Sequence, residues 1–160
     1  MIQLSNLSKY MFDTNVFRYL SDNAICLECI RKLGCYFHTN VQKSELLDNP
    51  DVSESQEHLK IMEDINSNIL TAKNDIWMDS LRWNDKEIWC EDPNTVARRM
   101  ANDKFTRKKY HYALIGACTK QEGLVLVTND GPFTKKMAGE GVPTTTPEEL
   151  FKICKHEHRV

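Results

Sequence analysis

The sequence predicts an α/β fold with a central, mainly parallel sheet of four or five strands and helices on both faces. Segments of strand and helix composition alternate near both ends of the chain, which is the pattern of parallel βα units. The run Leu124–Val127 is almost wholly apolar, as a strand buried on both faces is. A chain of 160 residues can bury one core, so we expect residues 1–160 to form a single domain.

The first part of the chain predicts two strand-to-helix units. Small polar residues and Gly34 mark the points where helices begin and end. The expected elements are a strand at Tyr10–Asp13, a helix capped by Thr14 and Asn15, a helix at Ala24–Leu33, a strand at Cys35–Thr39, and a helix from Asn40 that carries Glu45 and Leu46.

The middle of the chain predicts helices outside the sheet. Asn49–Ser55 has the composition of a polar loop, and apolar residues recur near helical spacing from Gln56 to about Ala72. We interpret residues 49–84 as a helical insertion or clamp. Asp92-Pro93 is typical of a helix start and predicts a further helix through Phe105.

The last part of the chain returns to alternating units. A helical run that includes Tyr112–Cys118 stops at Gly123 and leads into the apolar strand. A short helix at Phe133–Ala138, an edge strand at Val142–Thr145 and a helix started by Thr146-Pro147 complete the expected order.

Two carboxylates stand where predicted strands end, Asp13 after the first strand and Asp130 after the apolar one. In open parallel sheets, functional sites lie beyond the carboxyl ends of the strands. If the two strands are neighbours, both carboxylates face the same site.

Composition excludes several classes of protein. A net charge of −2 argues against bulk electrostatic coating of nucleic acid, although a local basic groove remains compatible with it. No apolar run is long enough for a membrane helix and the start lacks a secretory signal, so we expect a cytoplasmic protein without membrane contact. We interpret the six cysteines as reduced thiols, since a domain of 160 residues needs no disulfides and there is no secretion signal. The single Cys26-x-x-Cys29 pair is only a weak signal for a zinc site.

Several motifs together resemble those of PIN domains. Met11–Asn15 and Val125–Asp130 resemble the first and last acidic motifs of that family, and Ser44–Leu46 resembles the second. Ala113–Ala117 resembles the third motif, and Pro143–Leu150 resembles the closing strand and helix. The similarity covers about half the chain, in the family's order. It implies a three-layer PIN-like fold.

The resemblance also implies a site and its chemistry. Asp13, Glu45 and Asp130 would be the catalytic ligands of Mg²⁺ or Mn²⁺, which activates water for attack on a phosphodiester. Thr128 and Asn15 would support these carboxylates through hydrogen bonds.

Tyr112 departs from the family pattern, because an acidic residue normally stands immediately before the third motif. A neutral phenol does not replace a carboxylate as a magnesium ligand, so the site is one ligand short. Asp103 is the nearest upstream acid, but it lies on the opposite side of a continuous helix and becomes a ligand only if that helix breaks.

The substrate implied by the resemblance is single-stranded RNA. Lys108 and Lys109 lie one turn before Tyr112, on its side of the helix, and would contact phosphates. Basic runs of this kind also form ordinary solvated faces. Tyr112 would either stack on an unpaired base or pack beside the apolar helix.

Three functions follow from these observations. The first is a metal-dependent endoribonuclease like the VapC-type toxins, with a homodimer and a small antitoxin protein as partners. The second is a catalytically impaired RNA-binding or scaffold module, which Tyr112 supports. The third is a nuclease for structured DNA or RNA processing, aided by the insertion.

Overall fold

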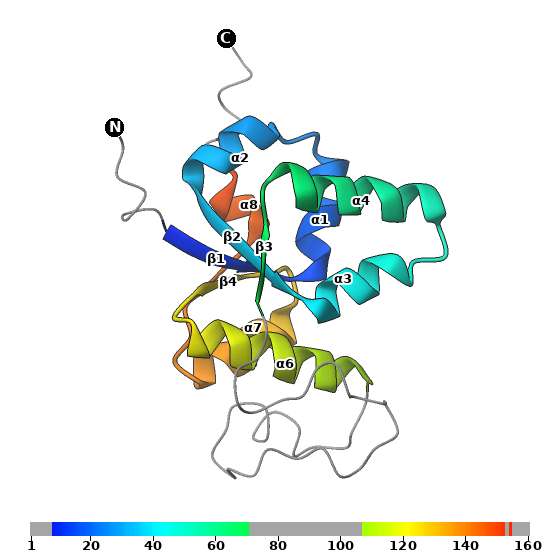
Figure 1. Cartoon of the computed structure of the whole chain (residues 1–160). Coiled ribbons are helices and arrows are strands. Elements are labelled where there is room, and N and C mark those ends of the chain that lie inside the picture. The colour runs from blue at the N-terminus through cyan, green and yellow to red at the C-terminus, as the bar shows by residue number, and fades with distance from the viewer. Residues whose placement is uncertain (1–7, 71–106, 153, 155–160) are drawn as a thin grey trace.

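The computed structural model describes residues 8–70, 107–152 and 154, and of residues 107–111 and 113 it describes the backbone alone. Its described strands form one five-stranded sheet in the order β3-β2-β1-β4-β5, and every neighbouring pair is parallel (Figure 1). The strands are β1 (Ser8–Phe12), β2 (Gly34–Thr39), β3 (Asn68–Leu70), β4 (Val125–Val127) and β5 (Thr144–Thr145). The predicted parallel α/β fold is confirmed.

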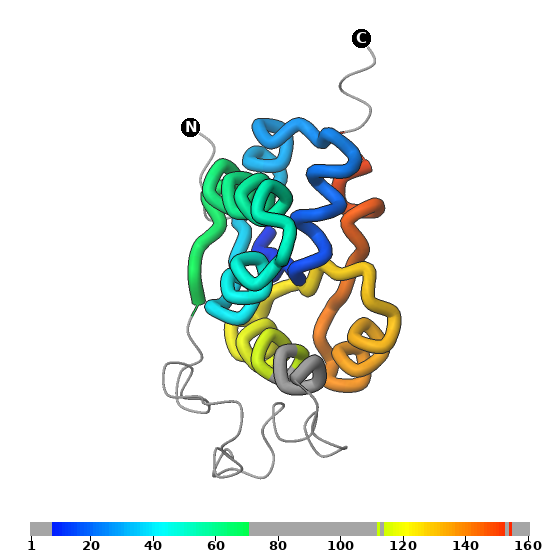
Figure 2. Tube along the Cα trace, turned by 90° about the vertical axis from the view of Figure 1, so that its right-hand side faces the viewer, coloured from blue at the N-terminus to red at the C-terminus, as the bar shows by residue number. Residues whose placement is uncertain are grey.

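Helices cover both faces of this sheet, which makes three layers (Figures 1 and 2). The helices α6 and α7 lie on one face, and α1, α2, α4 and α8 lie on the other. Their bounds are α1 (Thr14–Asp22), α2 (Leu27–Leu33), α3 (Asn40–Leu47), α4 (Val52–Asp64), α6 (Arg107–Gln121), α7 (Gly131–Gly139) and α8 (Pro147–Leu150).

The two hydrophobic cores follow from the alternation of side chains along the central strands. Met11 and Leu126 point toward α6 and α7, where they join a fully buried cluster. Their chain neighbours Phe12 and Val127 join the cluster on the opposite face. Because consecutive residues of a strand face opposite sides, a short apolar strand supplies both cores at once.

Gly34 allows β2 to lie close to β1. A Cβ atom at this position would stand 2.6 Å from the Ser8 carbonyl oxygen and 2.7 Å from the Tyr10 ring, so a larger residue would push the strands apart. Gly34 therefore opens β2 rather than only ending α2.

Several predicted boundaries are corrected by the structure. Asp13, and not Thr14 or Asn15, is the N-cap of α1, because its carboxylate accepts the Thr14 backbone N–H. Likewise, α2 begins at Leu27 and not at Ala24, because Ala24 has a positive φ of 46°, which a regular α-helix does not contain.

The predicted helix from Gln56 to about Ala72 is wrong at its end. Helix α4 ends at Asp64, and Asn68–Leu70 form β3, the edge strand beside β2. The change of direction occurs at Asn66, whose φ is 55°. The first part of the proposed insertion thus contributes α4, which packs on α1 and α3, and a strand of the sheet.

The remainder of the insertion, residues 71–84, lies outside the described residues, as does the predicted helix through Phe105. The single domain and the insertion therefore stay predictions. The C-terminal elements are confirmed, with Gly123 at φ 63° after α6 and β5 at the sheet edge.

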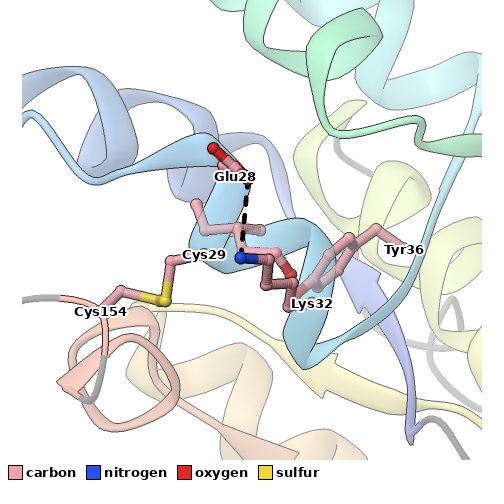
Figure 3. Close-up of a disulfide and its surroundings, with 6 residues drawn as sticks. Glu28, Cys29, Lys32, Tyr36 and Cys154 are labelled. Carbon is pink, nitrogen blue, oxygen red and sulfur yellow. Dashed lines mark hydrogen bonds and ion pairs between the residues drawn. A yellow bond between two sulfur atoms is a disulfide. The ribbon is translucent and has the colours of Figure 1, made fainter. Parts of the chain in front are cut away.

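A disulfide joins Cys29 of α2 to Cys154, which follows α8 (Figure 3). The interpretation of all six cysteines as reduced thiols is therefore wrong for this pair. The two residues are 125 positions apart in sequence, but the fold brings their Cα atoms to 5.8 Å, within the range that a disulfide spans. Cys26, Cys35 and Cys118 are free thiols.

None of the helices in the described residues combines the length and the apolar character that crossing a membrane requires.

Candidate functional site

The candidate site lies at the carboxyl ends of three adjacent strands, β2, β1 and β4. Phe12 and Val127 are paired in the sheet, so the segments that follow them start side by side. Asp13 follows β1, Asp130 follows β4 after two residues, and Glu45 lies in the helix after β2. The three predicted carboxylates therefore lie at the same end of the sheet, beyond the carboxyl ends of its strands.

Asp13 is the most deeply buried of these acids, with 5% of the residue exposed. One carboxylate oxygen accepts the Thr14 backbone N–H at 2.8 Å. The other accepts the Thr128 hydroxyl at 2.7 Å and the Asn15 side-chain amide at 3.3 Å. Three donors on a buried carboxylate hold it in one orientation.

Thr128 connects the end of β1 to the end of β4. Besides donating to Asp13, its buried hydroxyl accepts the Asp130 backbone N–H at 3.0 Å and the Asn15 amide at 3.3 Å. The Asn15 side-chain oxygen accepts the Asn129 backbone N–H at 3.3 Å. Thr128 and Asn15 therefore both hydrogen-bond to Asp13, and their support of a metal ligand stays a prediction.

Glu45 is brought to the site by the way α3 begins. Thr39 and Gln42 form a capping box, in which the Gln42 side-chain oxygen accepts the Thr39 backbone N–H at 2.8 Å. The Gln42 amide then donates to the carbonyl oxygen of Phe12 at 3.0 Å, which ties α3 to the end of β1. From α3, half-buried Glu45 accepts the Thr14 hydroxyl.

Gln42 and Thr14 are site residues that the sequence reasoning missed. Gln42 is fully buried and positions α3, and Thr14 contacts Glu45 instead of capping its helix. The spacing Thr39-x-x-Gln42 is a recognisable capping-box signal, so the start of α3 was open to prediction. The bond from Gln42 to a neighbouring strand depends on tertiary structure.

Tyr112 extends from α6 to the end of β4. Its hydroxyl donates to the Asp130 carboxylate, and its ring stacks on Phe133 with centroids 4.4 Å apart and planes 16° from parallel. Asp130 also caps α7, since its other oxygen accepts the Phe133 backbone N–H at 3.0 Å. Of the two predicted roles of Tyr112, the structure shows packing; stacking on a base stays a prediction.

Burial raises the pKa of Asp13 from 3.8 to about 6. The hydrogen bonds from Thr128 and Thr14 oppose this rise, and the nearby charges of Glu45 and Asp130 add to it. The Asp13 carboxylate is therefore near enough to Glu45 and to Asp130 for their charges to interact.

Burial also raises the pKa of Tyr112 well above the ordinary range of tyrosine. The hydrogen bond to Asp130 and that residue's negative charge add to the rise, followed by the charges of Asp13 and Glu45. Tyr112 is therefore a neutral phenol that donates its proton to a hydrogen bond.

The three acids at this end of the sheet suit a hard divalent cation, because all of them present carboxylate oxygens as ligands. Among the residues that the structure describes, no three Asp, Glu, His or Cys side chains form a complete metal-binding group as they stand. A bound cation would offset the mutual repulsion of the three carboxylates and so allow them to approach one another.

The remaining predicted site residues are only partly described. Lys108 and Lys109 lie in the first turn of α6, upstream of Tyr112, and their side chains lie outside the described atoms. Asp103 lies outside the described residues. Their roles toward metal or RNA stay predictions.

The described part of the chain thus forms an all-parallel α/β sheet with carboxylates beyond its central strands. No family model matches the sequence, and no curated protein matches it. Among solved structures, the PIN domain endonuclease Utp24 has a TM-score of 0.57 at 14% identity, over 90% of this chain and 88% of that chain. VapBC2 from Rickettsia felis, bound to a DNA fragment from its promoter, has a TM-score of 0.52 at 14% identity, over 86% of this chain and 98% of that one.

At this level of identity the likeness concerns the fold. The chain has the fold of PIN domain endonucleases, as its acidic motifs predicted.

Proposed function

We propose that the protein is a metal-dependent endoribonuclease that hydrolyses phosphodiester bonds of single-stranded RNA. The observation that carries the proposal is the placement of three acids beyond adjacent strands: Asp13 after β1, Asp130 after β4 and Glu45 in the helix after β2, with Asp13 near enough to both others for their charges to interact. The likeness to PIN domain endonucleases supports the same reading. Carboxylates gathered without a bound cation repel one another, so such a cluster favours cation binding.

In this proposal Asp13, Glu45 and Asp130 hold Mg²⁺ or Mn²⁺. When bound, the cation supplies activation of water and neutralises negative charge on the phosphate. Thr128 keeps the Asp13 carboxylate aimed at the site, and Thr14 holds Glu45. Lys108 and Lys109 bind RNA phosphates from the start of α6.

The likeness to VapBC2 supports a toxin-like role with a small antitoxin partner, and we propose a homodimer as the form that binds it. We place the activity in the cytoplasm, where single-stranded RNA is available as substrate. Copurification of the chain with the product of an adjacent short gene tests whether such an antitoxin partner binds it.

The test of the proposed activity is cleavage of a mixed single-stranded RNA by the purified full chain with Mn²⁺ or Mg²⁺. Asp13→Asn removes one charge and keeps a good N-cap residue, so the fold is retained. Asp22→Asn is the matched control, because Asp22 is an exposed acid at the far end of the same helix. We expect wild type and Asp22→Asn to cut, and Asp13→Asn and an EDTA-treated sample to be inactive. If none of the samples cleaves the RNA, the proposed nuclease activity is contradicted.

The second candidate is an RNA-binding module without catalysis. It is favoured by one observation, namely that Tyr112 occupies the place of the third acid and hydrogen-bonds to Asp130. In that case labelled RNA binds to wild type with micromolar or tighter affinity and remains uncut in both metals. Asp13→Asn then binds RNA as well as wild type does.

A further inference from the structure

We propose that Tyr112 is a positioning residue, whose hydroxyl holds the Asp130 carboxylate in the orientation that cation binding requires. The inference rests on the proposed function, because it concerns the same site. It gives the tyrosine at the third acidic position a role that a carboxylate there would not have.

The Asp130 carboxylate is held at both oxygens. One oxygen accepts the Phe133 backbone N–H at 3.0 Å, and the other accepts the Tyr112 hydroxyl. The first bond comes from the helix that Asp130 caps, and the second comes from α6, a separate element. Two donors from different elements restrict the rotation of the carboxylate about the Cβ–Cγ bond.

The hydroxyl of Tyr112 is itself fixed by the packing of its ring. The ring stacks on Phe133, which is fully buried in the core between the sheet, α6 and α7. The stacked rings leave the phenol little freedom to turn away from Asp130. Phe133 thus acts twice, through its backbone on Asp130 and through its ring on Tyr112.

The chemistry of the contact is compatible with a cation on the same carboxylate. A carboxylate accepts about four hydrogen bonds or ligands over its two oxygens, so a hydrogen bond from Tyr112 does not by itself prevent cation binding. A neutral phenol also leaves the negative charge of Asp130 in place, which a lysine or arginine partner would offset. Hydrogen-bonded partners of this kind orient metal ligands in many proteins.

Packing alone does not account for the hydroxyl. A phenylalanine would stack on Phe133 equally well, and the ring is the only part of Tyr112 that stacking uses. Tyr112→Phe therefore separates the two roles, because it keeps the ring and removes the donor. The contact with Asp130 is what the variant deletes.

The experiment is calorimetric titration of Mn²⁺ into the metal-free full chain, for wild type, Tyr112→Phe and Tyr36→Phe. Tyr36 is the matched control, since its buried hydroxyl donates to the Ile30 carbonyl at 2.6 Å on the other face of the sheet. Melting curves establish that each variant is folded. RNA cleavage is then followed as a function of Mn²⁺ concentration.

We expect Tyr112→Phe to bind Mn²⁺ about 10- to 100-fold more weakly than wild type, as loss of a ligand's hydrogen-bonded partner does. We expect Tyr36→Phe to match wild type, and excess Mn²⁺ to restore cleavage by Tyr112→Phe. Mn²⁺ binding by Tyr112→Phe that is equal to or tighter than that of wild type overturns the positioning role. It does not contradict the proposed nuclease activity. Absence of Mn²⁺ binding by wild type overturns the proposed function, and the positioning role with it.

Discussion

The strand-to-helix junctions after β1 and β4 have the same local design but different depths. Each has an aspartate that caps the next helix through its side chain, Asp13 for α1 and Asp130 for α7. Asp13 is 5% exposed, whereas Asp130 is only half-buried. Asp13 is held by Thr128, Asn15 and a backbone N–H, whereas Asp130 is held by a backbone N–H and by a phenol from another helix.

The difference shows how one local motif places two carboxylates in different environments. Burial makes protonation of Asp13 sensitive to pH near neutrality, because it raises the pKa to about 6. Asp130 lies nearer to solvent and needs a donor from α6 to complete its orientation. Thr128 couples the two junctions, since its hydroxyl contacts both.

Removal of the Thr128 hydroxyl gives the larger of two expected effects on this pair of junctions. Thr128→Val keeps the shape of the side chain but deletes the donor to Asp13 and the acceptor of the Asp130 N–H. We expect Mn²⁺ affinity to fall about 10- to 100-fold in calorimetry. Thr119→Val is the matched control, because the buried Thr119 hydroxyl donates to the Ile115 carbonyl oxygen at 2.6 Å, within α6.

The same Mn²⁺ affinity for Thr128→Val and Thr119→Val would mean that the two junctions act separately.

A change of pH gives the smaller expected effect, through Asp13 alone. A cation needs the ionised carboxylate, so below pH 6 protons compete with Mn²⁺ for a group whose pKa is about 6. We expect Mn²⁺ affinity to fall about tenfold between pH 7 and pH 5. An affinity that stays flat to about pH 4 would mean that Asp13 titrates like an exposed aspartate.

The same shift predicts the pH dependence of stability without metal. The raised pKa means that folded Asp13 binds its proton more tightly than the unfolded chain, where the value is 3.8. This contribution to stability is complete below pH 3.8 and is lost as pH rises through about 6. Urea unfolding of wild type and Asp13→Asn across this range measures it, since the variant lacks the titrating group.

Both junctions were predictable from the sequence, because each combines an apolar strand with a small polar segment and a helix start. Asp13 and Asp130 were located to the residue in this way, and Glu45 was located by its motif. Whether β1 and β4 are neighbours was not predictable, because strand order depends on how the whole sheet assembles. The structure supplies that order and thereby brings the acids to one edge.

Contacts between distant segments could not be predicted. The Cys29–Cys154 disulfide spans 125 positions and depends on α2 and the segment after α8 packing together. Ile69 and Leu70 continue the apolar spacing of α4, so the sequence predicted a helix where the structure has strand β3. The bond from Tyr112 to Asp130 likewise requires α6 to lie beside α7.

The most direct test of the central claim, that acids at both junctions bind one divalent cation, is Mn²⁺ titration of wild type, Asp13→Asn and Asp130→Asn. Asparagine caps helices as well as aspartate does, so both variants keep the helix starts and lose one charge each. We expect wild type to bind Mn²⁺ and each variant to lose at least about tenfold in affinity, while Asp22→Asn binds as wild type does. Binding that is unchanged in either junction variant would contradict a shared cation site.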